Sequence, residues 1–168
     1  SSNSLNGEIN ISDREHFQEL KTNENSIISF SDVIKSRTTG KESLVLAHAI
    51  RDENKDLLGV ITAVININAI NETLASIDLG KNGVSLLRRS DNTKLISRYP
   101  YNSKVSTNQP LPLDNPIFVQ IKAGKKAGTL EYIASTDGKK RVGSFIVMEN
   151  FPFYIQTAIS EDVYLAQW

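Results

Sequence analysis

The order of strand and helix signals in the second half of the chain constrains the fold more than any other feature. Two strand-like runs joined by the polar turn Ser90-Asp91-Asn92 come first. Asn115-Pro116 then supplies an N-cap and a first-turn proline for a helix ended by Gly124. Three further runs follow, and this order predicts one antiparallel sheet with helices on one face. The five predicted strands are Val84 to Arg88, Thr93 to Tyr99, Thr129 to Ser135, Arg141 to Met148 and Phe153 to Ile159.

The first half contains a shorter version of the same order. Ser12 opens a Ser-Asp-Arg-Glu capping box, which predicts a helix capped by Ser12, with Glu15 reaching back to the Ser12 amide, and ending near Thr22. One strand is then expected over Ser26 to Ile34, before a polar loop that contains Gly40.

Two longer runs complete the first half. Ser43 to Ile50 alternates and Leu58 to Ile67 is rich in β-branched residues, so the pair predicts an antiparallel hairpin across a solvated turn. Asn68 is expected to cap a helix that stops at Gly80. This half thus has three predicted strands and no counterpart of the hairpin that opens the second half.

Composition narrows the class of protein. Hydrophobic residues make up 39% and charged residues 23% of the 168 residues, which is typical of a globular domain. Nineteen basic residues balance nineteen acidic ones, so no basic surplus points to nucleic acid. The absence of cysteine excludes disulfides and thiolate metal sites. No apolar run reaches the ~20 residues of a membrane span, and the abrupt ends at Ser1–Ser4 and Trp168 suggest a fragment of a larger protein.

Several segments of the chain, among them Asp13 to Phe17, Ser36 to Lys41 and Arg98-Tyr99-Pro100, follow one another in a characteristic order. In this order they resemble segments of double Cache domains, also called PDC sensors, which are PAS-like extracytoplasmic modules of bacterial signalling proteins. Asp13-Arg14-Glu15-His16-Phe17 resembles the Asp-Arg-aromatic-Phe signature of that family, although His16 replaces the tyrosine that is common there. The other similar segments are Ser36 to Lys41, Leu46 to Ile50, Leu58 to Val60, Ala75 to Gly80, Arg98-Tyr99-Pro100 and Ile159 to Asp162.

The resemblance implies an α+β fold of two tandem subdomains, each an antiparallel sheet flanked by helices. We expect a membrane-distal subdomain over residues 1–79, N-terminally truncated, and a membrane-proximal one over residues 80–168. A truncated distal sheet would expose a strand edge, which favours homodimer pairing. The resemblance further implies a periplasmic domain of an inner-membrane protein. Trp168 would lie near the membrane, and the cytoplasmic output module would be a diguanylate cyclase first, then a histidine kinase, then a chemoreceptor module.

The expected ligand is a small metabolite such as a carboxylate, because arginine binds a carboxylate through two parallel hydrogen bonds. The resemblance places three cations near the distal pocket, which both histidines are candidates to join, with Ser43 and Thr39 as neutral donors. The acidic and aromatic set of amino-acid-binding relatives is not recognisable, so that specificity is not carried over. The predicted ligand-binding residues are Arg14, His16, Arg37, Lys41, Ser43 and His48.

Each candidate also has a purely structural interpretation. Arg14 suits an ion pair at a helix start, and Arg37 and Lys41 suit a solvated loop. His48 lies on an apolar strand face and is expected to be a core histidine more readily than a ligand contact, although a histidine pair could also respond to mildly acid pH. Arg88-Arg89 is interpreted as a solvated pair on a strand edge.

The sequence gives no support to an enzyme. It contains no metal-ligand spacing, no glycine-rich phosphate loop and no serine nucleophile motif, so no catalytic residue, cofactor or metal is predicted. The rival interpretation is a ligand-free, PAS-like module that dimerises or binds a partner protein.

Overall fold

The computed structural model describes residues 10–134 and 137–166, and within them the chain forms two antiparallel sheets with four helices. The chain divides after Ile67 into two compact units, here called the first and the second unit. The α+β class predicted from the sequence is confirmed. The roles expected for Ser1–Ser4 and Trp168 lie outside the described residues, as does the end of the strand predicted to reach Ser135. The subdomain boundary expected after residue 79 stays a prediction.

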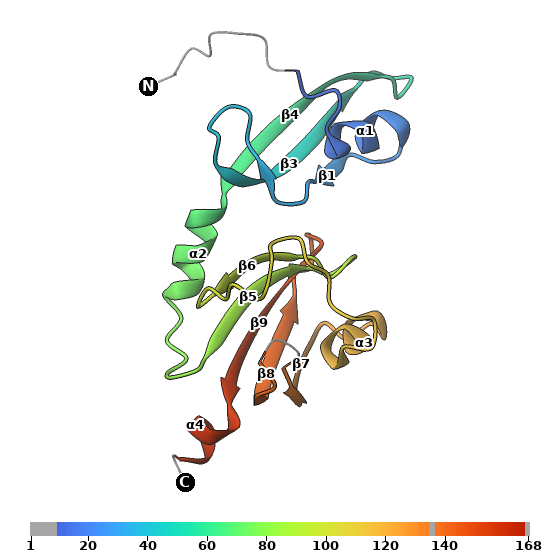
Figure 1. Ribbon diagram of the computed structural model, residues 1–168. Coiled ribbons are helices and arrows are strands. Elements are labelled where there is room, and N and C mark those ends of the chain that lie inside the picture. The colour runs from blue at the N-terminus through green and yellow to red at the C-terminus, as the bar shows by residue number, and fades with distance from the viewer. Residues whose placement is uncertain (1–9, 135–136, 167–168) are drawn as a thin grey trace. The chain divides into compact units, whose positions relative to one another are not determined.

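The sheet of the first unit is built on a long hairpin (Figure 1). β3 (Glu42–Arg51) pairs along its whole length with β4 (Leu57–Asn66), which confirms the predicted hairpin. The other edge of β3 carries the short strands β1 (Ile28–Phe30) and β2 (Ile34–Lys35). Among the described strands β4 pairs with β3 alone.

Two local predictions in the first unit are wrong. Helix α1 (Glu15–Thr22) begins three residues after Ser12, and its N-cap residue is Arg14, without a side-chain cap. The single strand predicted over Ser26 to Ile34 is two strands, β1 and β2, and Ser31 lies between them. Its hydroxyl accepts the Val45 backbone N–H at 2.9 Å, which ends the regular pairing of β1.

The core of the first unit lies between α1 and one face of the hairpin. Leu20 of α1 is fully buried against Ala47 and Ala49 of β3, with Val60 of β4 partly buried beside them. Because neighbouring residues of a strand face opposite ways, Val45, Thr62 and Val64 share this face with the core.

Helix α2 (Ile67–Ala75) starts at the division and clusters with the second unit. Its Leu74 is buried, and the Leu74 carbonyl accepts the Ser85 hydroxyl at 2.9 Å. The Ser97 hydroxyl donates a hydrogen bond to the Asn71 side-chain oxygen at 2.5 Å. Asn68, expected to be the cap, lies inside the helix, and the helix ends at Ala75, before Gly80.

The second unit contains the predicted five-stranded sheet in the order β6-β5-β9-β8-β7 (Figure 1). Asn115 caps α3 (Pro116–Lys122) as predicted, and its side chain accepts the N–H groups of Ile117 and Phe118. Helix α4 (Glu161–Leu165) follows β9 directly. The strands are β5 (Val84–Arg89), β6 (Leu95–Tyr99), β7 (Ala127–Ile133), β8 (Lys140–Val147) and β9 (Phe153–Ser160).

The core of the second unit lies between α3 and one face of this sheet. Ile117 of α3 packs against Phe145 of β8 and Tyr154 of β9, all of them buried.

Among the described helices none has the length and apolar character of a membrane-spanning segment.

Candidate functional site

A cavity of about 70 Å³ lies in the first unit, between the start of α1, the loop after β2 and the inner face of the hairpin. This cavity, which we call the first cavity, has Ile34, Val45 and Val64 as its apolar wall. Its polar lining comes from the α1 start and from the loop. The polar lining residues are Arg14, His16, Ser36, Arg37, Thr38 and Thr62.

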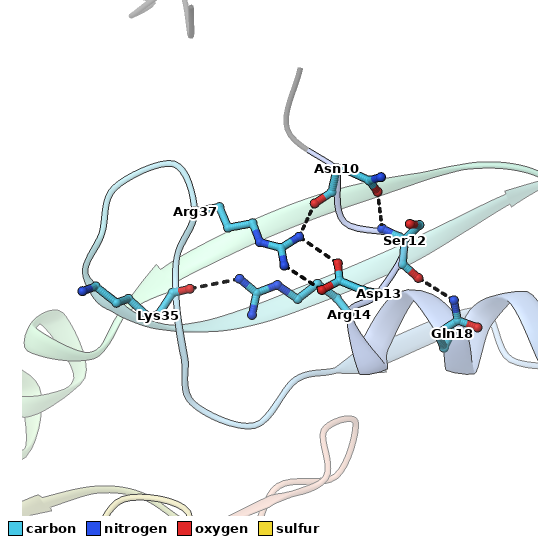
Figure 2. A network of polar contacts seen from close by, with 7 residues as sticks. All are labelled: Asn10, Ser12, Asp13, Arg14, Gln18, Lys35 and Arg37. Atoms are coloured by element: carbon cyan, nitrogen blue, oxygen red, sulfur yellow. Dashed lines mark hydrogen bonds and ion pairs between the residues drawn. The ribbon is translucent and has the colours of Figure 1, made fainter. Parts of the chain in front are cut away.

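Arg37 connects the loop to the segment before α1 (Figure 2). Its guanidinium donates two parallel hydrogen bonds to the Asp13 carboxylate, at 2.7 and 2.6 Å, and a further one to the Asn10 carbonyl oxygen. The Arg37 guanidinium holds the pKa of Asp13 at about 2, below its ordinary value of 3.8. Both side chains are substantially exposed, so solvent screens the pair.

Arg14 lies beside this pair without joining it. Its guanidinium donates one hydrogen bond to the Lys35 carbonyl oxygen, at 3.2 Å (Figure 2). Within the described residues Arg14 forms no salt bridge with a carboxylate, so the structural interpretation of an ion pair at the helix start is wrong. Most of the hydrogen-bonding capacity of this guanidinium is available to a ligand.

His16 is 3% exposed and lines the same cavity. Burial lowers the pKa of its imidazole below the ordinary 6.5, and the nearby Arg14 charge lowers it further. The ring is therefore neutral at pH 7, with one nitrogen able to donate and the other to accept.

The loop after β2 is shaped by Ser36. Its hydroxyl accepts the backbone N–H groups of Thr38 and Thr39, and its carbonyl accepts the Gly40 N–H. Gly40 adopts a positive φ of 69°, which glycine tolerates without steric cost. This turn brings the Ser36, Arg37 and Thr38 side chains to the cavity.

Of the predicted ligand-binding residues, the structure brings together Arg14, His16 and Arg37 around the cavity. The other three do not line it. Lys41 is exposed, and the Ser43 hydroxyl donates to the Lys41 carbonyl oxygen at 3.2 Å. His48 occupies the opposite face of β3 from Val45 and is exposed, so the expectation of a core histidine is wrong.

Sequence reasoning missed the lining residues Ser36, Thr38 and Thr62. Ser36 carries a usable signal, since a small hydroxyl residue four positions before a loop glycine is well suited to accept the turn amides. Thr62 carries none, because its contribution depends on the register between β3 and β4. No group of three or more histidine and acidic side chains in the described part of the chain is placed to hold a metal ion.

The interpretation of Arg88-Arg89 as a solvated pair is wrong. Arg88 is 5% exposed and Arg89 is 9% exposed, because β5 is an interior strand paired with both β6 and β9. The Arg89 guanidinium binds the Asp91 carboxylate and lies 5.8 Å from the centre of the Phe153 ring.

No protein-family model matches the chain, and no curated protein matches it in sequence. Solved structures do match. The extracellular domain of a candidate histidine kinase, rpHK1S-Z16, aligns with 94% of this chain at 22% identity and a TM-score of 0.75. The periplasmic sensory domain of the Campylobacter jejuni chemoreceptor Tlp1 aligns with 94% at 17% identity and a TM-score of 0.73.

The ligand-binding domain of the Pseudomonas aeruginosa amino-acid chemoreceptor PctB, in complex with L-Gln, aligns with 99% of the chain at 17% identity and a TM-score of 0.66. The chain spans 63%, 59% and 64% of these three structures, respectively. The chain therefore has the Cache-like fold of bacterial sensory domains, as the sequence resemblance implied.

Proposed function

We propose that this chain is the extracytoplasmic part of a bacterial membrane signalling protein, that it senses a small molecule in the first cavity, and that it has no catalysis of its own. The observation that carries this proposal is the meeting of Arg14, His16 and Arg37 around one cavity. The fold supports it, since the matching structures are sensory and ligand-binding domains of a candidate histidine kinase and of chemoreceptors.

The lining favours a small carboxylate as the ligand. No Asp or Glu is among the described residues that line the cavity, whereas two guanidinium groups are. The nearby Asp13 is already bound by Arg37. PctB is an amino-acid chemoreceptor. The ammonium group of an amino acid is matched best by a carboxylate acceptor, and no carboxylate is among the described lining residues of the first cavity. A carboxylate without an ammonium group is therefore the better fit.

Signalling would follow from competition for Arg37. A ligand carboxylate that binds Arg14 and Arg37 competes with Asp13, and this changes how the segment before α1 is tied to the loop after β2. Binding would favour one of two arrangements already in equilibrium. We propose that the second unit passes the change through α4 to a membrane-anchored output module. The reported neighbours include a candidate histidine kinase and chemoreceptors, while a diguanylate cyclase stays a prediction from the sequence alone.

A ligand-free dimerisation module is the second candidate function. The observation that favours it is the exposure of apolar side chains on the hairpin of the first unit, where Leu58 is 68% and Ile61 is 64% exposed. Such apolar surface is typical of protein contacts.

The two candidates are separated by a thermal-shift screen of the chain against small carboxylates, with amino acids as a second set. We expect one carboxylate to raise the melting temperature in proportion to the logarithm of its concentration above Kd. Arg14→Ala and Arg37→Ala should each weaken Kd about tenfold or more, because a hydrogen bond to a charged group contributes about 1.5–3 kcal/mol. His16→Gln should weaken it less.

The chain offers matched controls for these variants. Lys41→Ala removes a cation from the same loop but outside the cavity, and His48→Gln removes the histidine on the opposite face of β3. Both should leave Kd unchanged. Stabilisation that survives Arg14→Ala and Arg37→Ala in folded protein would contradict the proposed site. No stabilisation by any compound, together with a concentration-dependent dimer in sedimentation, would favour the ligand-free module.

A further inference from the structure

A second cavity, of about 50 Å³, lies wholly within the second unit. It sits on the face of the five-stranded sheet that also carries the core residues Phe145 and Tyr154, beneath the connection between β6 and α3. One part of its wall is apolar, with Val84, Leu86 and Val105. The other part carries Arg88, Arg98 and Arg141, with Tyr132 and Gln156. Neither the sequence motifs nor the proposed function account for three arginines in one small cavity.

Arg88 is buried, with 5% of its surface exposed. Its Nη1 donates to the carbonyl oxygens of Thr93, at 2.7 Å, and Gln109, at 2.9 Å. Its Nε is buried and has no hydrogen-bond partner in the described structure. Within the described residues no carboxylate forms a salt bridge with Arg88. A buried guanidinium without a counter-charge is costly, so it needs an anion or water to compensate it.

Arg141 faces the same cavity from β8. Its two Nη atoms bind the Asp137 carboxylate, each at 2.7 Å, while its buried Nε has no hydrogen-bond partner among the residues that the structure describes. Arg98, on β6, is half-buried and donates to the Pro100 carbonyl oxygen. Burial and the Arg141 charge lower the pKa of Arg98, and burial lowers that of Arg88. Asp137 is thus the single carboxylate that binds any of these three guanidinium groups in the described residues.

Tyr132 provides a neutral donor at the same place. The Gln156 side-chain amide donates to the Tyr132 hydroxyl oxygen at 2.6 Å, which leaves the hydroxyl proton free to be donated to a ligand. Gly143 leaves room for the ring, since a Cβ atom there would lie 2.7 Å from Tyr132 Cε1. The Tyr132 ring can therefore lie against β8 because residue 143 has no side chain.

We propose that the second cavity is a binding site for a small aliphatic carboxylate of the size of acetate or propionate. The carboxylate would accept hydrogen bonds from the Arg88 and Arg98 guanidinium groups and from the Tyr132 hydroxyl. The alkyl end would contact Val84 and Leu86. Since one water needs ~10–15 Å³ in such a cavity, 50 Å³ holds about three to five non-hydrogen atoms. The mixed lining favours a carboxylate with an apolar end over sulfate or phosphate, which are polar on every side.

The test is a titration of the chain with sodium acetate and sodium propionate, followed by melting temperature and by the ¹⁵N–¹H resonances of arginine Nε. At a limit of about −1.5 kcal/mol per non-hydrogen atom, acetate can bind no tighter than about 40 μM and propionate no tighter than about 3 μM, so concentrations from about 1 μM to 50 mM cover the range. Sodium chloride at matched ionic strength and acetamide, which has nearly the same shape without the charge, are the reference compounds. We expect saturable stabilisation by the carboxylates alone, with shifts of buried Nε–H resonances.

Two variants locate the site without disturbing the deeply buried Arg88. Arg98→Gln removes a half-buried charge and should weaken Kd about tenfold or more. Tyr132→Phe removes one oxygen atom and should weaken it about two- to tenfold. Arg14→Ala and Arg37→Ala, in the first cavity, should leave acetate binding unchanged, so this inference stands or fails separately from the proposed function.

Three results would overturn the inference. One is stabilisation by acetate no greater than that by chloride or acetamide, which would identify a water-filled cavity. Another is acetate binding that Arg98→Gln and Tyr132→Phe leave unaltered in folded protein. The third is binding that disappears in Arg14→Ala, which would place acetate in the first cavity.

Discussion

The two units repeat one plan and use their arginines differently. In the first unit, α1 is followed by β1 and β2, then β3 and β4; in the second, α3 is followed by β7, β8 and β9. In each, the helix covers one sheet face, and a cavity lies on that same face. The repeat is incomplete, because β9 pairs on its far side with β5, whereas β4 has no second partner strand among the described residues.

The arginines of the first cavity are accessible, while two of the three in the second are buried. The Arg37 side chain is 39% exposed and its partner Asp13 is 62% exposed, whereas the side chain of Arg141 is 4% exposed. Both pairs are bidentate with nearly equal distances. The Arg37–Asp13 pair is therefore expected to exchange with water or a ligand, whereas the Arg141–Asp137 pair is expected to be structural. The reason is that burial removes the water that would otherwise screen the ion pair or replace one of its partners.

The largest expected effect tests whether the two helices anchor their units equally. Leu20→Ala in α1 and Ile117→Ala in α3 both empty fully buried positions, so each should reduce the free energy of unfolding by about 3 kcal/mol. Urea unfolding gives the size, and hydrogen exchange shows that protection is lost in the unit that carries the substitution. A cost below about 1 kcal/mol for one variant would show that its helix is not an anchor.

The next largest effect is the difference between the two carboxylate–arginine pairs in their contribution to the free energy of unfolding. Asp137→Asn leaves the buried Arg141 without its counter-charge and should cost about 2 kcal/mol, a discounted value because the Asp137 side chain is 29% exposed. Asp13→Asn should change the stability little, since its pair is solvated. Equal costs in urea unfolding at pH 7 would contradict the assignment of these pairs to different roles.

The pH dependence of the same variants gives a second measurement. Arg141 holds the pKa of Asp137 at about 2, below the ordinary 3.8, so the unfolded state binds a proton more readily. The stability due to Asp137 is therefore complete above about pH 4 and is lost as the pH falls toward 2. The difference between wild type and Asp137→Asn should shrink over this interval.

The smallest effect concerns the two histidines. The pKa of His16 is lowered below 6.5 by burial, so the unfolded state again binds more protons, and the His16 contribution is lost as the pH falls below about 6.5. His16→Gln should flatten the dependence of melting temperature on pH between 7 and 5. His48→Gln, which replaces the exposed histidine of the same unit, is the matched variant for comparison. An unaltered slope in His16→Gln would show that His16 is not the titrating group.

Much of the fold could be predicted because its signals are local. The β3–β4 hairpin follows from apolar runs on either side of a charged turn, and α3 follows from Asn115-Pro116 with Gly124. The errors occur where a side chain replaces a backbone partner. The Ser31 hydroxyl binds the Val45 N–H between β1 and β2, where one strand was predicted, and Ser12 is displaced from its expected capping position by the turn from Ile11 to Arg14.

The candidate site was predictable in part. Arg14, His16 and Arg37 come from segments that resemble a known family, and all three line the first cavity. Lys41 lies close to them in sequence yet outside the cavity, because the turn around Ser36 directs only part of the loop inward. The second cavity could not be predicted, since its three arginines stand far apart in the sequence and only strand pairing brings them together, although Arg98 belongs to a segment that resembles the family.

The sequence by itself determined most of the elements, their order and their class, because periodicity, caps and turn residues act over a few neighbouring positions. The tertiary structure alone decided which charged side chains are buried. Arg88 and Arg37 have the same side-chain chemistry, but strand pairing encloses Arg88 between β6 and β9, while a loop leaves the Arg37 side chain 39% exposed. Burial depends on segments distant in the sequence that come together only when the sheet forms, and burial decides how strongly each charge interacts with its partners.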